Sequence, residues 1–258
     1  MKRRKFLQAV GTGSVASFTV ASSAETAAAS SREWINSFEY GTTGNYDSVN
    51  VEIYKPKFVD SEYRYWARLG AQDVFGQATD NGYISGYEIT EWNADDFYVD
   101  CDGDILDQWD TYRTDQGWTA DGSHFIAVNC GGSPAGAASP SGDSWKTDRS
   151  SYAKTYGNDD GKQSFKHTAA HEMLHNHLSS YGCDDVQSLT CSHNSEHSLG
   201  DVVYRDGQYL ETPMAGKKHW DGGDCVYYGD DYDGITMDLS SCTQQALAYS
   251  AEHHDDQH

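Results

Sequence analysis

The chain has 258 residues, of which 40 are acidic and 18 are basic, so its formal net charge is −22 with neutral His. Such a charge repels phosphate backbones and argues against nucleic-acid binding. Hydrophobic residues make up 37% and aromatic residues 13%, which is too much for a disordered acidic chain and enough to build a folded core.

Residues 1–29 predict an export signal that is removed from the mature protein. They open with a basic stretch that contains Arg3 and Arg4, continue with a weakly apolar run rich in Gly, Ser and Ala, and end at Ala29. The segment resembles a twin-arginine signal, which implies export and an extracellular or cell-envelope location. No later stretch reaches the ~18 to 20 apolar residues of a membrane helix, so the mature chain is expected to lack a membrane span.

The acidic excess resembles that of proteins adapted to high salt. Loss of the basic signal would leave residues 30–258 even more acidic than the whole chain. At ~1 M salt the Debye length falls to about 3 Å, which screens the repulsion between carboxylates. We therefore expect folding and activity to depend on high salt.

The hydrophobic pattern predicts strands and a helix in the first part of the mature chain. Apolar residues alternate there as in half-buried strands or form a short run as in a buried strand, and one intervening stretch has helical spacing. The strands are expected at 48–54, 83–92, 97–100 and 124–129, the helix at 60–77, and a loop rich in Gly and Ser at 131–143.

The pattern changes in the later part of the chain, where residues 164–179 have helical spacing. Asp206-Gly207 supplies the turn of a hairpin at 202–209, because these residue types adopt positive φ angles readily. A last helix is expected at 240–252 with a serine at its N-cap, and the tail that follows is expected to be frayed.

Six Cys remain in the predicted mature chain, an even number that suits an exported protein. Many connectivities are open to six Cys, but their order suggests local pairs. No Cys-x-x-Cys motif occurs, which argues against a thiolate zinc cluster and against a redox motif. The suggested pairs are Cys101 with Cys130, Cys183 with Cys191, and Cys225 with Cys242.

The chemistry is concentrated in His171-Glu172-Met173-Leu174-His175, within the helix expected at 164–179. Residues four apart lie one turn above each other on a helix, so both imidazoles can reach one metal ion at about 2.0 to 2.1 Å. Glu172 points to a neighbouring side, where its carboxylate can take a proton from water at the metal. The pattern predicts a catalytic metal site with Glu172 as general base.

This motif resembles that of the zincin metallopeptidases, which are built around His-Glu-x-x-His. The resemblance implies one zinc ion bound by His171, His175 and a third ligand, and hydrolysis of peptide or protein substrates. It also implies an α+β fold with a twisted mixed sheet, an active-site helix and a smaller irregular C-terminal lobe. A single catalytic domain is expected at 30–258, with lobes at 30–182 and 183–258.

The third ligand decides which branch of the zincins the chain resembles. A metzincin would have Gly and His three and six residues after His175, where this chain has Leu and Tyr. Metzincins also carry a Met in a tight turn beneath the zinc, and Met214 fits that role if a disulfide-stapled insertion precedes His197 as third ligand. Glu196 is the alternative, since gluzincins use a Glu, but the suitability of imidazole for zinc favours His197.

Two further interpretations stay open. Asp100, Asp102 and Asp104 hint at a calcium loop, but the EF-hand positions for Gly and Glu hold Ile and Thr, so calcium has no further support. An exported zinc-binding envelope or adhesion protein without hydrolytic activity would need the same zinc ligands, although it would have no use for Glu172.

Overall fold

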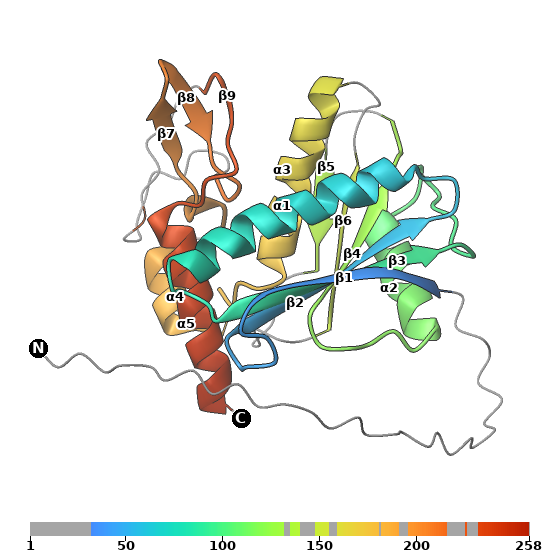
Figure 1. Ribbon diagram of the computed structural model, residues 1–258, viewed down its shortest axis with the longest axis horizontal. Helices are drawn as coiled ribbons and strands as arrows, with labels where there is room; N and C mark the ends of the chain where they lie inside the picture. Colours follow the sequence, from blue (N-terminus) through green and yellow to red (C-terminus); the bar gives the residue numbers. More distant parts are fainter. Residues whose placement is uncertain are drawn as a thin grey trace, which may run out of the picture. The chain divides into compact units, whose positions relative to one another are not determined.

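A six-stranded mixed sheet forms the centre of the fold in the computed structural model (Figure 1). The predicted export signal at 1–29 lies outside the described residues, and residues 31–258 form one compact unit. The structure describes residues 32–131, 135–139, 148–154, 159–180, 182–190, 196–215, 225 and 232–257.

The central sheet is parallel in its middle and antiparallel at both edges. It consists of β1 (Arg32–Gly41), β2 (Ser48–Pro56), β3 (Gly86–Ala94), β4 (Ser123–Val128), β5 (Ala135–Ala138) and β6 (Arg149–Lys154). The strand order is β1-β3-β2-β4-β6-β5. The four inner strands run parallel, whereas β1 pairs antiparallel with β3 and β5 pairs antiparallel with β6.

Helices cover both faces of this sheet, as parallel strands require. On one face, Val51 and Ile53 of β2 belong to the same buried core as α1 (Ser61–Asp80) and α3 (Asp159–His175). On the other face, Tyr54 packs in a mostly aromatic core with Trp109 of α2 (Ile105–Asp115). Helices and a mixed sheet together confirm the predicted α+β class.

Aspartates cap the first two helices. The side chain of Asp60 accepts a hydrogen bond from the backbone N of Glu62 at 3.0 Å, and Asp104 accepts one from Asp107 N at 3.1 Å. A side-chain oxygen at the N-cap satisfies an amide that has no partner within the helix. Asp104, one of the residues that hinted at calcium, therefore has a structural role at the start of α2.

Short elements make up the C-terminal part of the unit: α4 (Asp184–Leu189), the 3-10 turn η1 (Glu196–Ser198), a small sheet of β7 (Val202–Arg205), β8 (Gln208–Glu211) and β9 (Gly234–Ile235), and α5 (Ser241–Gln257). The predicted hairpin is confirmed, and its turn residues Asp206 and Gly207 have φ angles of 53° and 85°. Ser240 caps α5, because its Oγ accepts a hydrogen bond from Thr243 N at 2.9 Å.

Two of the three suggested disulfides are formed, Cys101–Cys130 and Cys225–Cys242, with Cα–Cα distances of 5.4 and 6.0 Å. The suggestion for Cys183 is wrong in this structure, because Cys183 carries a free buried thiol whose Sγ lies 3.7 Å from the carbonyl oxygen of Tyr249. Its suggested partner, Cys191, lies outside the described residues. Disulfides form and persist in oxidising compartments, so the two bridges indicate an extracytoplasmic environment.

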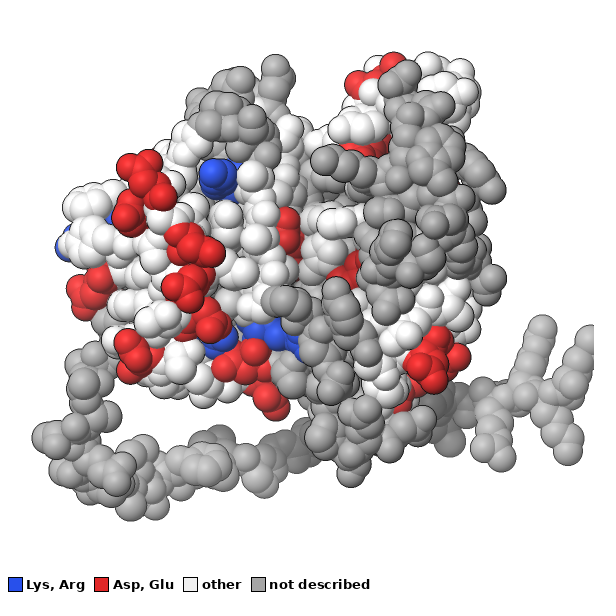
Figure 2. Space-filling view, turned by 180° about the vertical axis from the view of Figure 1, so that it is seen from behind, with Lys and Arg blue, Asp and Glu red and all other residues white. Residues whose placement is uncertain are grey.

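Acidic side chains are spread over the face of the molecule shown in Figure 2, where basic side chains form only a few small patches. In the part of the chain that the structure describes, no helix combines the length and the apolar character needed to cross a bilayer.

Candidate metal centre

Helix α3 buries an apolar face and presents the motif histidines on another. Ala169, Met173 and Leu174 are completely buried in the core that α3 shares with α1 and the sheet. His171 and His175, four residues apart, are half-buried and follow one another on the helix surface. The helix ends at His175, four residues before the predicted end, so the second histidine occupies its last position.

His197 reaches the same place from η1, because the segment that carries it is held against a tight turn. The backbone N of Gly200 donates to the carbonyl oxygen of Met214 at 3.1 Å. A Cβ atom at Gly200 would come within 1.8 Å of the backbone N of Ala215, so only glycine allows this approach. The turn itself is closed by a hydrogen bond of 3.0 Å from Ala215 N to Thr212 O.

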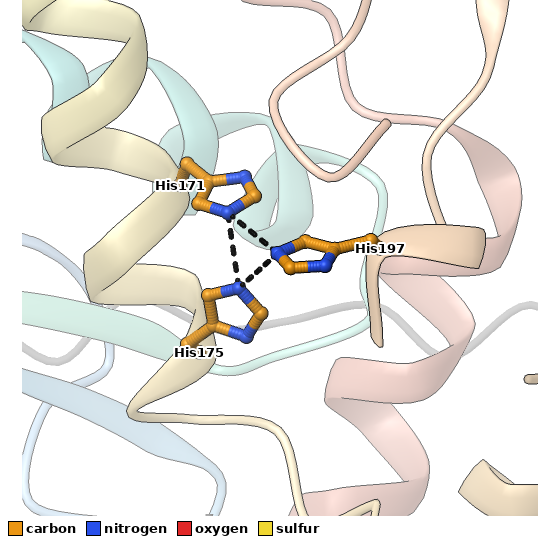
Figure 3. A group of neighbouring side chains, drawn as sticks. All are labelled: His171, His175 and His197. Carbon is orange, nitrogen blue, oxygen red and sulfur yellow. Dashed lines mark hydrogen bonds between the residues drawn. The ribbon is translucent and has the colours of Figure 1, made fainter. Parts of the chain in front are cut away.

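The three imidazoles point their Nε2 atoms at one another (Figure 3). The Nε2 distances are 3.0 Å between His171 and His175, and 3.1 Å from each of these to His197. Two ligand bonds of 2.0 to 2.1 Å at a tetrahedral angle span about 3.3 Å between nitrogens. The observed triangle is therefore close to the size that one zinc-sized ion requires.

The other ring nitrogens show which protonation state the site favours. Nδ1 of His171 contacts the carbonyl oxygen of Pro213, and Nδ1 of His175 contacts a carboxylate oxygen of Glu196. Both oxygens are acceptors, so each Nδ1 carries a proton, and in the neutral form of each ring Nε2 has only a lone pair. Two lone pairs 3.0 Å apart repel each other, and a cation between them removes that repulsion.

Glu196 supports His175 and does not join the group of converging ligand atoms. Its second carboxylate oxygen accepts a hydrogen bond of 2.6 Å from the hydroxyl of Ser180, and its side chain is buried. Burial lowers the pKa of His175, but the hydrogen bond and charge of Glu196 outweigh this effect and raise it. A carboxylate behind a ligating imidazole fixes the ring and increases its basicity. The structure thus brings His197 into the cluster and places Glu196 behind it.

Burial and the neighbouring imidazoles have the opposite effect on His171. Desolvation is the main cause that lowers its pKa well below the usual value, and His175 and His197 lower it further. The neutral form of His171, which has a lone pair at Nε2, is therefore favoured. A neutral imidazole is the form that binds a metal ion.

Met214 lies in the tight turn and is completely buried. The residue before it, Pro213, provides the carbonyl oxygen that His171 contacts, so the turn also orients a ligand. Sequence reasoning singled out Met214 but not this carbonyl group. A backbone oxygen carries no residue-specific signal, and only the fold could reveal it.

Glu172 is buried beside the edge strand β5. Desolvation raises its pKa to about 7, although the charge of His175 opposes this increase. A Cβ atom at Gly136 of β5 would lie 2.5 Å from the Cγ of Glu172, so the glycine makes room for this side chain. A carboxylate with a pKa near neutrality is well suited to take up and release a proton at neutral pH.

His167 extends the histidine row by one more turn of α3. Burial is the main cause that lowers its pKa to about 4, against an opposite effect of the backbone of Glu211 and Thr212. Its buried Nε2 has no hydrogen-bond partner within the described residues. Protonation of His167 would lower the pKa of His171, which indicates that the two side chains lie near each other.

Within the described residues, the three histidines are the one group of His, Cys, Asp or Glu placed to hold a metal ion. The acidic loop at 100–104 forms no such group. No protein-family model matches the chain, and no curated protein sequence matches it either. The function must therefore be inferred from the geometry of the site.

Proposed function

We propose that the protein is a zinc-dependent metallopeptidase, exported by the twin-arginine route and adapted to high salt. The observation that carries the proposal is the convergence of three Nε2 atoms beside a buried carboxylate whose pKa is about 7. Three imidazoles with two of their Nδ1 protons fixed match the donor set that zinc prefers in catalytic sites. Met214 would have the role of the metzincin methionine.

Each residue of the site would have its own role. His171, His175 and His197 would hold the ion, and Glu196 would orient His175. Zinc, when bound, supplies Lewis-acid chemistry that makes water a nucleophile near neutral pH. Glu172 would take the proton of the attacking water and transfer it to the departing amine.

A Glu172→Gln variant tests this assignment, because the amide keeps the size of the side chain and cannot act as a base. Zinc content should stay near that of the wild type, and hydrolysis of casein or a quenched peptide in high salt should fall by at least about 10²-fold. Zinc content is measured by elemental analysis and hydrolysis by fluorescence. A Glu172→Gln variant with wild-type activity would refute the role of this residue.

The rival function is that of an exported zinc-binding envelope or adhesion protein. A wild-type protein that holds zinc but cleaves nothing in a broad peptide library would favour it. The buried carboxylate beside the metal site supports the enzyme, since burying a carboxylate costs stability and a purely binding site gains nothing from it.

A further inference from the structure

A pocket of about 180 Å³ lies at the carboxyl ends of three neighbouring strands. It is lined by residues 57–59 after β2, by Tyr98, Val99 and Cys101 after β3, and by residues 129–130 after β4. None of these residues belongs to α3 or η1.

The topology of the sheet explains why a pocket forms at this place. β2 and β3 are parallel neighbours, and the chain leaves β2 towards α1 on one face and leaves β3 towards α2 on the other. Where the connections after two neighbouring strands run to opposite faces of the sheet, a crevice forms outside the carboxyl ends of those strands. Open sheets with parallel strands bind their ligands in such crevices.

Phe58 at the mouth of the pocket is held in a costly conformation. Its φ angle is 68°, in the left-handed region that bulky residues avoid, and its side chain is 83% exposed. An exposed aromatic side chain gains little from burial, so folding alone does not offset this cost. Backbone strain of this kind is concentrated at binding and catalytic sites.

The side chains around the pocket indicate which ligand it suits. The ring of Tyr98 is 56% exposed and lies 5.8 Å from that of Phe58, with the two planes tilted by 56°. Lys57 Nζ lies 5.7 and 5.4 Å from the two ring centroids. A hydrogen bond with Tyr98 is the main cause that raises the pKa of Lys57, so this amine stays a charged donor.

The volume of the pocket and the charges around it limit the class of ligand further. An apolar cavity of about 150 Å³ accepts a benzene ring, so this pocket has room for one aromatic side chain. Asp95 and Asp96 act on Lys57 and would repel an anionic ligand. An uncharged acceptor such as a peptide carbonyl oxygen suits the amine better than a carboxylate does.

We propose that this pocket binds one aromatic side chain of a polypeptide against the rings of Phe58 and Tyr98, with Lys57 donating a hydrogen bond to an adjacent peptide carbonyl oxygen. Aromatic pairs gain stabilisation beyond their buried area when the rings are tilted or offset. The ligand is thus an uncharged aromatic residue within a chain. The proposal does not depend on hydrolytic activity at the metal centre.

Binding is tested by calorimetry with N-acetyl-phenylalanine amide as the probe and the wild-type protein in high salt. Saturable binding is expected, with at least about fivefold weaker binding of N-acetyl-alanine amide and of N-acetyl-phenylalanine, which carries a carboxylate. Tyr98→Ala should weaken probe binding at least about fivefold. Tyr204→Ala, which removes another exposed tyrosine, on β7, should leave it unchanged.

Two more measurements separate this pocket from the metal centre and from a general loss of fold. Treatment with a chelator should leave probe binding unchanged. Phe58→Gly should abolish binding without lowering the unfolding temperature, because glycine adopts a positive φ without strain. The proposal is overturned if the wild type shows no saturable binding, if Phe58→Gly binds as the wild type does, if the chelator abolishes binding, or if the carboxylate probe binds more tightly than the amide.

Discussion

Glu196 allows a sharp test of how the metal site is built, because it touches a ligand without being one. In Glu196→Gln the side chain keeps its size, but the hydrogen bond with Nδ1 of His175 loses its charge. A hydrogen bond to a charged group contributes about 1.5 to 3 kcal/mol and a neutral one about 0.5 to 1.5 kcal/mol. The expected loss of about 1 to 1.5 kcal/mol corresponds to roughly tenfold weaker zinc binding.

Competition with a chromophoric chelator at about pH 8 measures this change in affinity, because protons compete less for the imidazoles there than at neutral pH. Asp185→Asn is the matched control, since it removes one exposed carboxylate from α4. It should change zinc affinity less than about twofold in high salt, where long-range charge effects are screened. Equal affinities of Glu196→Gln and the wild type would refute the supporting role of Glu196. Complete loss of zinc in Glu196→Gln would instead make Glu196 a ligand.

Four further outcomes follow from the contacts described above. His197→Ala should lose nearly all zinc in elemental analysis, as three protein ligands have no spare member. Desolvation raises the pKa of Glu52, but its contacts with His124, Tyr54 and Arg32 outweigh this effect and lower it. Its stabilising effect is therefore present above the pKa of an unfolded Glu and is lost as pH falls through the lower folded value. The difference in unfolding temperature between the wild type and Glu52→Gln should accordingly disappear in acid. Replacing both Cys101 and Cys130 by Ser should cost about 3.5 kcal/mol in denaturant unfolding, because the bridge closes a 29-residue separation. Dialysis to millimolar salt should abolish the circular dichroism signal of the fold, because carboxylate repulsion is then unscreened.

The sequence predicted the helix that carries His171 and His175 because the signal there is local. Two histidines four residues apart must share a helix face, and no tertiary information is needed to see this. His197 could be predicted as the third ligand only from the resemblance to metzincins, since nothing local links it to His175. The contacts of His171 Nδ1 with Pro213 and of His175 Nδ1 with Glu196 could not be predicted from the sequence. They depend on how η1 and the turn at 212–215 pack.

The fold was predictable where burial imposes a period. The strands at 48–54 and 124–129 and the helix at 60–77 are confirmed by β2, β4 and α1. The strand predicted at 97–100 is wrong, since these residues only follow the turn after β3. The edge strand β5 was missed because Ala135–Ala138 is short and made of small residues that carry little strand propensity.

One helix was missed and another was predicted too short, because polar residues lie near their ends. α2 has few apolar residues, and its start was interpreted as an acidic cluster because Asp104 both caps a helix and resembles a calcium ligand. The tail was expected to fray, yet α5 extends to Gln257. Polar residues near helix ends therefore give ambiguous signals, since capping, solvation and metal binding all use the same carboxylates.

The location of Glu172 connects the fold to the proposed chemistry. A carboxylate in water has a pKa too low to retain a proton at neutral pH, and burial is what raises the pKa of Glu172 to about 7. The small residues that made β5 hard to recognise are the ones that let the strand approach this side chain, since a Cβ at Gly136 would collide with it. The small residues of β5 therefore explain both the weak strand signal of this segment and the close approach of the strand to Glu172 of α3.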